Sequence, residues 1–137
     1  MRKLLVITAL VLFAGIAFGQ TLDKGKVIGF AHISVEFNEG ITMDQFMDFL
    51  KKDYLPEFEK NYKGVQVVIM KADRGEHVNQ LGWIMVFESL EARNKFWPEE
   101  GEPSEAGKAA REKMQPMIDK MQSFGTVTLG YTDWIIQ

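Results

Sequence analysis

The chain contains no cysteine among its 137 residues. A protein without cysteine has no disulfide bonds, so packing alone must stabilise its fold. The sequence also lacks the P-loop, the dinucleotide-binding fingerprint and the nucleophile elbow. The common motifs of nucleotide-dependent enzymes and of serine hydrolases are therefore missing.

Positive charge is scarce as well. The 16 Lys and Arg residues are outnumbered by 19 Asp and Glu residues, which gives a formal net charge of −3. A nucleic-acid-binding domain is recognised by a basic patch or stripe, and none stands out here. We therefore expect no nucleic-acid partner.

The N-terminus has the pattern of a secretory signal peptide. Arg2 and Lys3 form a basic start, and residues 4–18 are an almost unbroken apolar run without charge. Small residues at the usual offsets predict cleavage after Gly19, which leaves Gln20 first. The alternative is an uncleaved membrane anchor, but the run is short for a spanning helix, which needs ~20 apolar residues. No cysteine follows the run, so a lipoprotein is not expected.

Cleavage at this site predicts an exported protein, periplasmic or secreted. It removes two positive charges and no negative ones, so the formal net charge moves from −3 to −5. We expect residues 20–26 to be a flexible leader and residues 27–137 to form one domain. No second long apolar segment follows, so we expect no membrane partner after cleavage.

The remaining chain reads as strand, helix, strand, strand, helix, strand. The predicted strands are 27–37, 65–71, 81–88 and 126–136; the helical regions lie between Thr42 and Gly64 and from Ser89 to about Phe124, the second broken at 98–103. This order predicts an α+β, ferredoxin-like βαββαβ fold with a four-stranded antiparallel sheet. Right-handed crossovers place the helices on one face of that sheet.

Local signals support the helix boundaries. Thr42 with Gln45 three residues on forms a capping box, and Ser89 is suited to cap the second region. Pro56 is expected to kink or restart the first helix after Tyr54.

The strands are apolar on both faces, so the sheet face without helices needs a cover. That face must carry a set of large side chains. They are Phe30, Val68 or Ile69, Trp83 or Ile84, and Trp134 or Ile135. Monomers rarely expose contiguous apolar patches above a few hundred Å². We therefore expect a homodimer in which two sheets pack face to face and close an eight-stranded barrel that can hold a small ligand.

Two short segments resemble the dimeric α/β-barrel superfamily, which includes stress-responsive A/B-barrel and antibiotic-biosynthesis monooxygenase-like proteins. They are residues 31–37, with a histidine inside the first strand, and residues 86–92 at the exit of the third strand, with Pro98 following. By element order, the resemblance spans roughly residues 27 to 136. It implies the dimeric barrel and a cavity for a small molecule.

His32 is the candidate catalytic residue. It alternates on its strand with Phe30, Ser34 and Glu36, and a histidine facing the barrel could titrate or hydrogen-bond a ligand. In cyclase members of the superfamily a similarly placed histidine orients a polyketide-like substrate, and in haem-binding members such a residue could be an axial ligand. The alternative is a core histidine with a polar neighbour. The second family histidine, expected beside Pro98, is missing, which argues against cyclase chemistry.

The expected ligand-binding residues combine this strand with aromatic side chains. They are Phe30, His32, Ser34, Tyr54, Trp83 and Trp134, and Tyr131 could also line the cavity. The alternative interpretation is that the aromatic residues are ordinary core. We expect no metal and no cofactor: His32 and His77 lack close-spaced ligand partners, and His77 is expected to be solvated in a hairpin loop.

Three functions remain open. The first is a non-catalytic protein that binds a small, largely apolar or aromatic molecule in the barrel. The second is a cofactor-independent monooxygenase or related enzyme with His32 as its polar group. The third is a structural dimer with a filled barrel. Fold-level analogy does not separate them.

Overall fold

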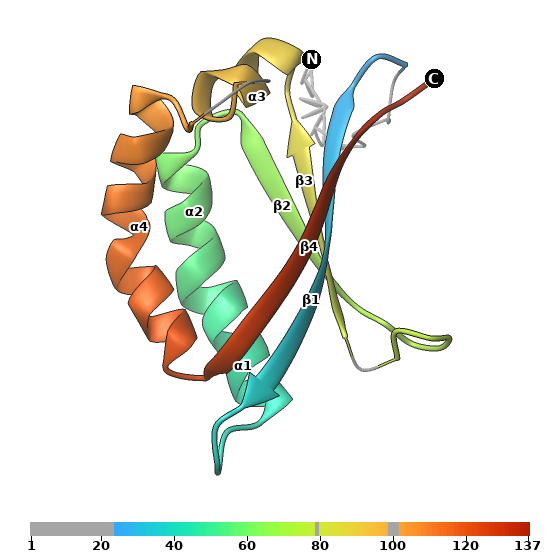
Figure 1. Ribbon diagram of the computed structural model, residues 1–137, viewed down its shortest axis with the longest axis vertical. Coiled ribbons are helices and arrows are strands. Elements are labelled where there is room, and N and C mark those ends of the chain that lie inside the picture. Colours follow the sequence, from blue (N-terminus) through green and yellow to red (C-terminus); the bar gives the residue numbers. More distant parts are fainter. Residues whose placement is uncertain (1–23, 79, 99–101) are drawn as a thin grey trace, which may run out of the picture.

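The computed structural model describes residues 24–78, 80–98 and 102–137. A four-stranded antiparallel sheet is covered by helices on one face, while the other face carries no helix (Figure 1). The strands are β1 (Val27–Phe37), β2 (Val65–Lys71), β3 (Leu81–Phe87) and β4 (Gly125–Ile135). The helices are α1 (Met43–Phe49), η1 (Leu50–Tyr54), α2 (Leu55–Asn61), α3 (Leu90–Phe96) and α4 (Glu105–Gln122).

The sheet order β2-β3-β1-β4 confirms the predicted ferredoxin-like fold, with antiparallel pairing throughout. The expected signal peptide, and the leader as far as residue 23, lie outside the described residues. The predicted bounds of β1 and β2 agree with the structure, those of β3 differ by one residue at its end, and those of β4 differ by one residue at each end.

The predicted capping box is confirmed. The Gln45 backbone N–H donates to Thr42 Oγ1 at 3.3 Å, and the Thr42 backbone N–H donates to Gln45 Oε1 at 2.9 Å. Ser89 caps α3 as expected, because its Oγ accepts from the Ala92 N–H at 3.0 Å.

The first helical region has a wide turn where a kink was predicted. The five residues of η1 form a π-helical turn, and the Leu55 N–H reaches back to the Leu50 carbonyl. Pro56 lies at the start of α2, where its missing N–H costs nothing. Leu50 and Tyr54, at the two ends of η1, are both buried.

The strand register assigns the two faces of the sheet. Ala31 pairs with Trp83 and is 1% exposed, so these residues face the helices. Ile28, Phe30 and His32 alternate with them and face away, opposite Val86, Ile84 and Gly82. The core lies between the sheet and the helices. Its largest fully buried side chains are Phe46, Phe87, Leu50, Leu81, Met114 and Val27.

Candidate functional site

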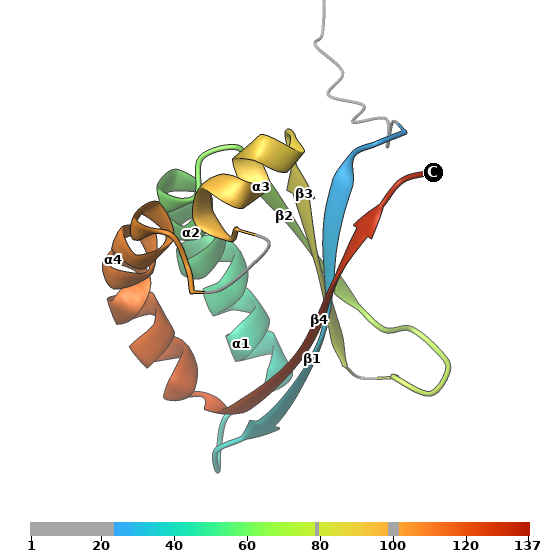
Figure 2. The same ribbon diagram turned by 45° about the horizontal axis from the view of Figure 1, so that its top comes forward.

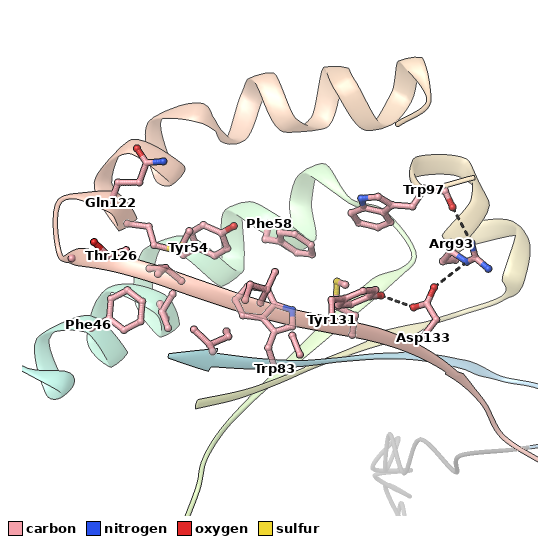
Figure 3. Close-up of a pocket in the computed structure, with 18 residues that line it drawn as sticks. Phe46, Tyr54, Phe58, Trp83, Arg93, Trp97, Gln122, Thr126, Tyr131 and Asp133 are labelled. Atoms are coloured by element: carbon pink, nitrogen blue, oxygen red, sulfur yellow. Dashed lines mark hydrogen bonds and ion pairs between the residues drawn. The ribbon is translucent and has the colours of Figure 1, made fainter. Parts of the chain in front are cut away.

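A cavity of about 880 Å³ lies between the sheet and the helices. Side chains of β1, β3 and β4 form one wall, and residues of α1, η1, α2, α3 and the end of α4 contribute the other (Figure 3). The lining is mostly apolar. Along β4, Leu129 and Tyr131 face the helix side yet are 58% and 42% exposed, so the cavity opens at this strand.

The inner wall of the cavity is aromatic. The Tyr54 and Phe58 rings each meet Trp83 edge-on, with ring centroids 5.7 Å apart in both cases. Tyr54 is 9% exposed, and its hydroxyl has no hydrogen-bond partner among the described residues. Burial, helped by the nearby Tyr62, raises the pKa of Tyr54 to about 12. A neutral phenol O–H inside an apolar cavity can donate to an acceptor on a bound molecule.

The outer end of the cavity is polar. Tyr131 Oη donates to Asp133 Oδ1 at 2.6 Å, and Arg93 Nε lies 3.6 Å from Asp133 Oδ2. Arg93 Nη1 also donates to the Trp97 carbonyl at 3.2 Å (Figure 3). Burial raises the pKa of Tyr131, and the hydrogen bond to Asp133 raises it further. The pair of opposite charges limits the cost of placing Arg93 in a half-buried position.

The structure divides the predicted site residues between the two faces of the sheet. Tyr54 and Trp83 line the cavity on the helix side. Phe30, His32, Ser34 and Trp134 lie on the helix-free face, as the alternating register requires. The sequence predicted either Trp83 or Ile84 on the helix-free face. The structure places Ile84 there and Trp83 on the helix side. The ligand-binding role of these residues stays a prediction.

The helix-free face has an apolar half and a polar half. In the apolar half, Phe30 lies between Ile84 and Thr132, and Ile28 lies between Val86 and Trp134. Val68 and Trp134 in this half are 50% and 58% exposed. The polar half contains Ser34 and Glu36 of β1 with Thr126 and Thr128 of β4.

Two contacts between polar residues were not predicted from the sequence. The first is between Arg93 of α3 and Asp133 of β4. Tyr131 and Asp133 are two residues apart on one strand, and this spacing indicates that both face the same side of the sheet. The second is between the rings of His77 and His32: His77 is exposed in the loop between β2 and β3, as expected, but its contact with His32 was not expected. No spacing rule connects these two positions.

The described part of the chain, residues 24–78, 80–98 and 102–137, contains no cluster of three or more His, Cys, Asp or Glu side chains arranged to hold a metal ion. Within the same described ranges, no helix is long and apolar enough to cross a membrane.

Comparison with known proteins supports the fold. No family model matches the chain, and no curated protein matches it significantly. Among solved structures, a NIPSNAP family protein from Agrobacterium tumefaciens covers 80% of this chain and 91% of its own, with 14% identity and a TM-score of 0.53.

A second Agrobacterium tumefaciens NIPSNAP family protein, of unknown function, covers 82% of this chain and 91% of its own, with 9% identity and a TM-score of 0.52. SnoaB, a cofactor-independent oxygenase from Streptomyces nogalater, covers 79% of this chain and 91% of its own, with 13% identity and a TM-score of 0.48. The likeness to the two NIPSNAP family structures supports the predicted fold and shows the fold alone.

Proposed function

We propose that this chain is an exported homodimer that binds a small, largely apolar molecule in the cavity between its sheet and its helices, without catalysing a reaction. The cavity itself carries the proposal. Its volume of about 880 Å³ falls in the range of ~300–1,000 Å³ typical of small-molecule sites. Such sites combine an apolar lining with a few polar groups, as Tyr54 and the Tyr131–Asp133 pair do here.

The proposed ligand site differs in place from the barrel interior expected from the sequence. The cavity is on the helix side, whereas the residues suited to sheet-to-sheet packing are on the helix-free face. The two faces therefore have separate roles in this proposal: one holds the ligand and the other holds the second copy.

The homodimer is supported by the apolar half of the helix-free face. Trp134 and Val68 are more than a third exposed there, next to Phe30 and Ile84. Large apolar side chains gathered on one face are typical of an interaction surface. A second copy with the same face is the simplest partner. Export is supported by the basic start, the apolar run and the small residue at position 19.

A cofactor-independent oxygenase or related enzyme is the second candidate, favoured by one observation. Tyr131, Asp133 and Arg93 place a hydroxyl, a carboxylate and a guanidinium beside an apolar cavity, where they could move a proton to or from a bound molecule. His32 is on the other face of the sheet, so Asp133 rather than His32 would be the polar group of such an enzyme.

The test uses N-phenyl-1-naphthylamine, a neutral dye whose fluorescence rises in apolar sites. We expect saturable binding to the wild-type chain, and at least ~tenfold weaker binding to Val127→Phe, whose new ring enters the cavity, equivalent to ~1.4 kcal/mol. The matched control is Thr128→Phe, the next residue of β4, which faces the helix-free side. Equal binding by both variants, or no binding by the wild type, would overturn the proposal and favour a structural dimer.

Native mass spectrometry of the chain purified from its own host would identify a retained ligand. Oxygen consumption on incubation with that ligand separates the two candidates. Steady consumption that is lost in Asp133→Asn supports the enzyme, and binding without turnover supports the non-catalytic role.

A further inference from the structure

The only two histidines of the chain meet on the helix-free side of the sheet. His32 comes from β1 and His77 from the loop that joins β2 to β3. Their ring centroids are 4.4 Å apart and the rings are tilted by 47°. Phe30 meets the His32 ring edge-on, with centroids 4.9 Å apart. Two imidazoles are thus held together on the face of the sheet opposite the cavity described above.

The loop that carries His77 is closed by backbone hydrogen bonds. The Ala72 N–H donates to the Gln80 carbonyl at 2.9 Å, and the Gln80 N–H donates to the His77 carbonyl at 2.9 Å. Gly75 has a φ of +101°, a conformation that other residues rarely adopt. Figure 2 shows this loop reaching out on the helix-free side. The contact with His32 is therefore made by a folded loop.

Space is left open around His32. Its in-register neighbours are Gly82 on β3 and Gly130 on β4, so neither flanking strand places a Cβ beside the ring. A Cβ at Gly130 would meet nothing within 4 Å. At Gly82 the corresponding space is occupied by Met70, whose Cε lies 2.9 Å from the Cβ position. One side of the imidazole is consequently accessible to a small ion with its water ligands.

Neither imidazole has a hydrogen-bond partner within the described parts of the chain. Neutral imidazole nitrogen is a common ligand for Zn²⁺, Cu²⁺ and Ni²⁺. Two metal–nitrogen bonds of ~2.0–2.1 Å require the nitrogens to be roughly 3–3.4 Å apart. Ring centroids 4.4 Å apart are compatible with that nitrogen spacing.

We propose that His32 and His77 form a two-imidazole site for a divalent transition-metal ion of the Ni²⁺, Cu²⁺ and Zn²⁺ group. Water completes the coordination, because the two histidines supply only two ligands. Both histidines belong to one chain, so the site requires neither the proposed dimer nor the proposed ligand cavity.

Calorimetric titration of the full chain, without an affinity tag, tests the site with CuCl2 and NiCl2. We expect one ion per chain, with Cu²⁺ bound more tightly than Ni²⁺. His32→Gln and His77→Gln should each weaken binding at least ~tenfold, and the double variant should be little worse than either, because one imidazole alone is a poor site. The double variant has neither histidine nor cysteine, so it is a clean baseline.

Both side chains are exposed, so the variants are expected to fold, which circular dichroism checks. Electron paramagnetic resonance of the Cu²⁺-loaded wild-type chain gives a readout that needs no variant. Hyperfine coupling to two imidazole nitrogens supports the site. The site would be overturned by coupling to one nitrogen or none, or by wild-type affinity in either single variant or in the double variant.

Discussion

Gly29 of β1 and Tyr131 of β4 fit together on the helix side of the sheet: the phenol of Tyr131 lies over Gly29, where a Cβ would overlap with Tyr131 Oη. Gly29 is in register with Asp133, the hydrogen-bond acceptor of that hydroxyl. The absence of a side chain on β1 therefore allows the polar end of the cavity to form on β4.

Gly29→Ala should displace the Tyr131 ring from Asp133. Overpacking of this kind costs ~1–3 kcal/mol, which we expect as a loss in the free energy of unfolding measured with urea. Gly130→Ala is the matched control, since a Cβ there meets nothing within 4 Å, and it should be neutral or slightly stabilising. In a Tyr131→Ala background the cost of Gly29→Ala should vanish; an unchanged cost would show that Tyr131 is not its cause.

Ile84→Asp should dissociate the proposed homodimer. Ile84 lies in the apolar half of the helix-free face, between Phe30 and Val68, where a dimer would bury an unpaired carboxylate. Burial of the unpaired carboxylate costs ~3 kcal/mol, which raises the dissociation constant of the dimer about a hundredfold. Equilibrium sedimentation at micromolar concentration measures it, with Thr128→Asp in the polar half as the control. A wild-type chain that sediments as a monomer would refute the dimer.

Alkaline pH should destabilise the fold through Tyr54. Its pKa is raised to about 12 from 10.0, so the folded state keeps a proton that the unfolded state loses. The contribution of Tyr54 is fully present below pH 10 and is lost as the pH rises from 10 to about 12. Two pKa units correspond to on the order of 2–3 kcal/mol.

Urea unfolding between pH 9 and 11.5 checks this expectation. Tyr54→Phe keeps the ring and removes the titrating group, so its stability should fall less steeply over that range. Parallel curves for the two proteins would mean that Tyr54 is not the group responsible. Absorbance at 295 nm should likewise show little phenolate near pH 10, because the pKa is raised for all three tyrosines.

N-terminal sequencing of the exported protein should begin near Gln20. The expectation rests on the basic start and the uncharged apolar run of residues 4–18. Replacement of Gly19 by Gln, which is too large for the usual cleavage site, should leave precursor uncleaved. Recovery of intact Met1 from the membrane fraction of the wild type would contradict cleavage.

The fold was accessible from the sequence because its signals are local. Capping by Thr42 and Ser89, and the apolar strands 27–37 and 65–71, define element order without tertiary information. Which face each strand residue occupies was not accessible, because β3 is apolar on both sides. Trp83 and Ile84 are equally suited to either face, and the tertiary arrangement alone decides between them.

The candidate site was predicted only in part for the same reason. Tyr54 and Trp83 were expected to line the barrel interior together with His32, but they line the cavity on the helix side, and His32 lies on the other face of the sheet. The contact between His32 and His77 depends on the path of an irregular loop, which hydrophobic periodicity does not encode. Arg93 reaches Asp133 only because α3 packs near the end of β4.

The π-helical turn Leu50–Tyr54 also sets the rotational phase of everything that follows it in the helix. An α-helix has 3.6 residues per turn, so one residue more or less rotates the next segment by about 100°. The wider turn of η1 absorbs one residue relative to a regular α-helix, so Phe58 and Tyr62 keep their orientation toward the core. Sequences that share this cavity should therefore either keep the wide turn or lack one residue here and have a regular α-helix in its place.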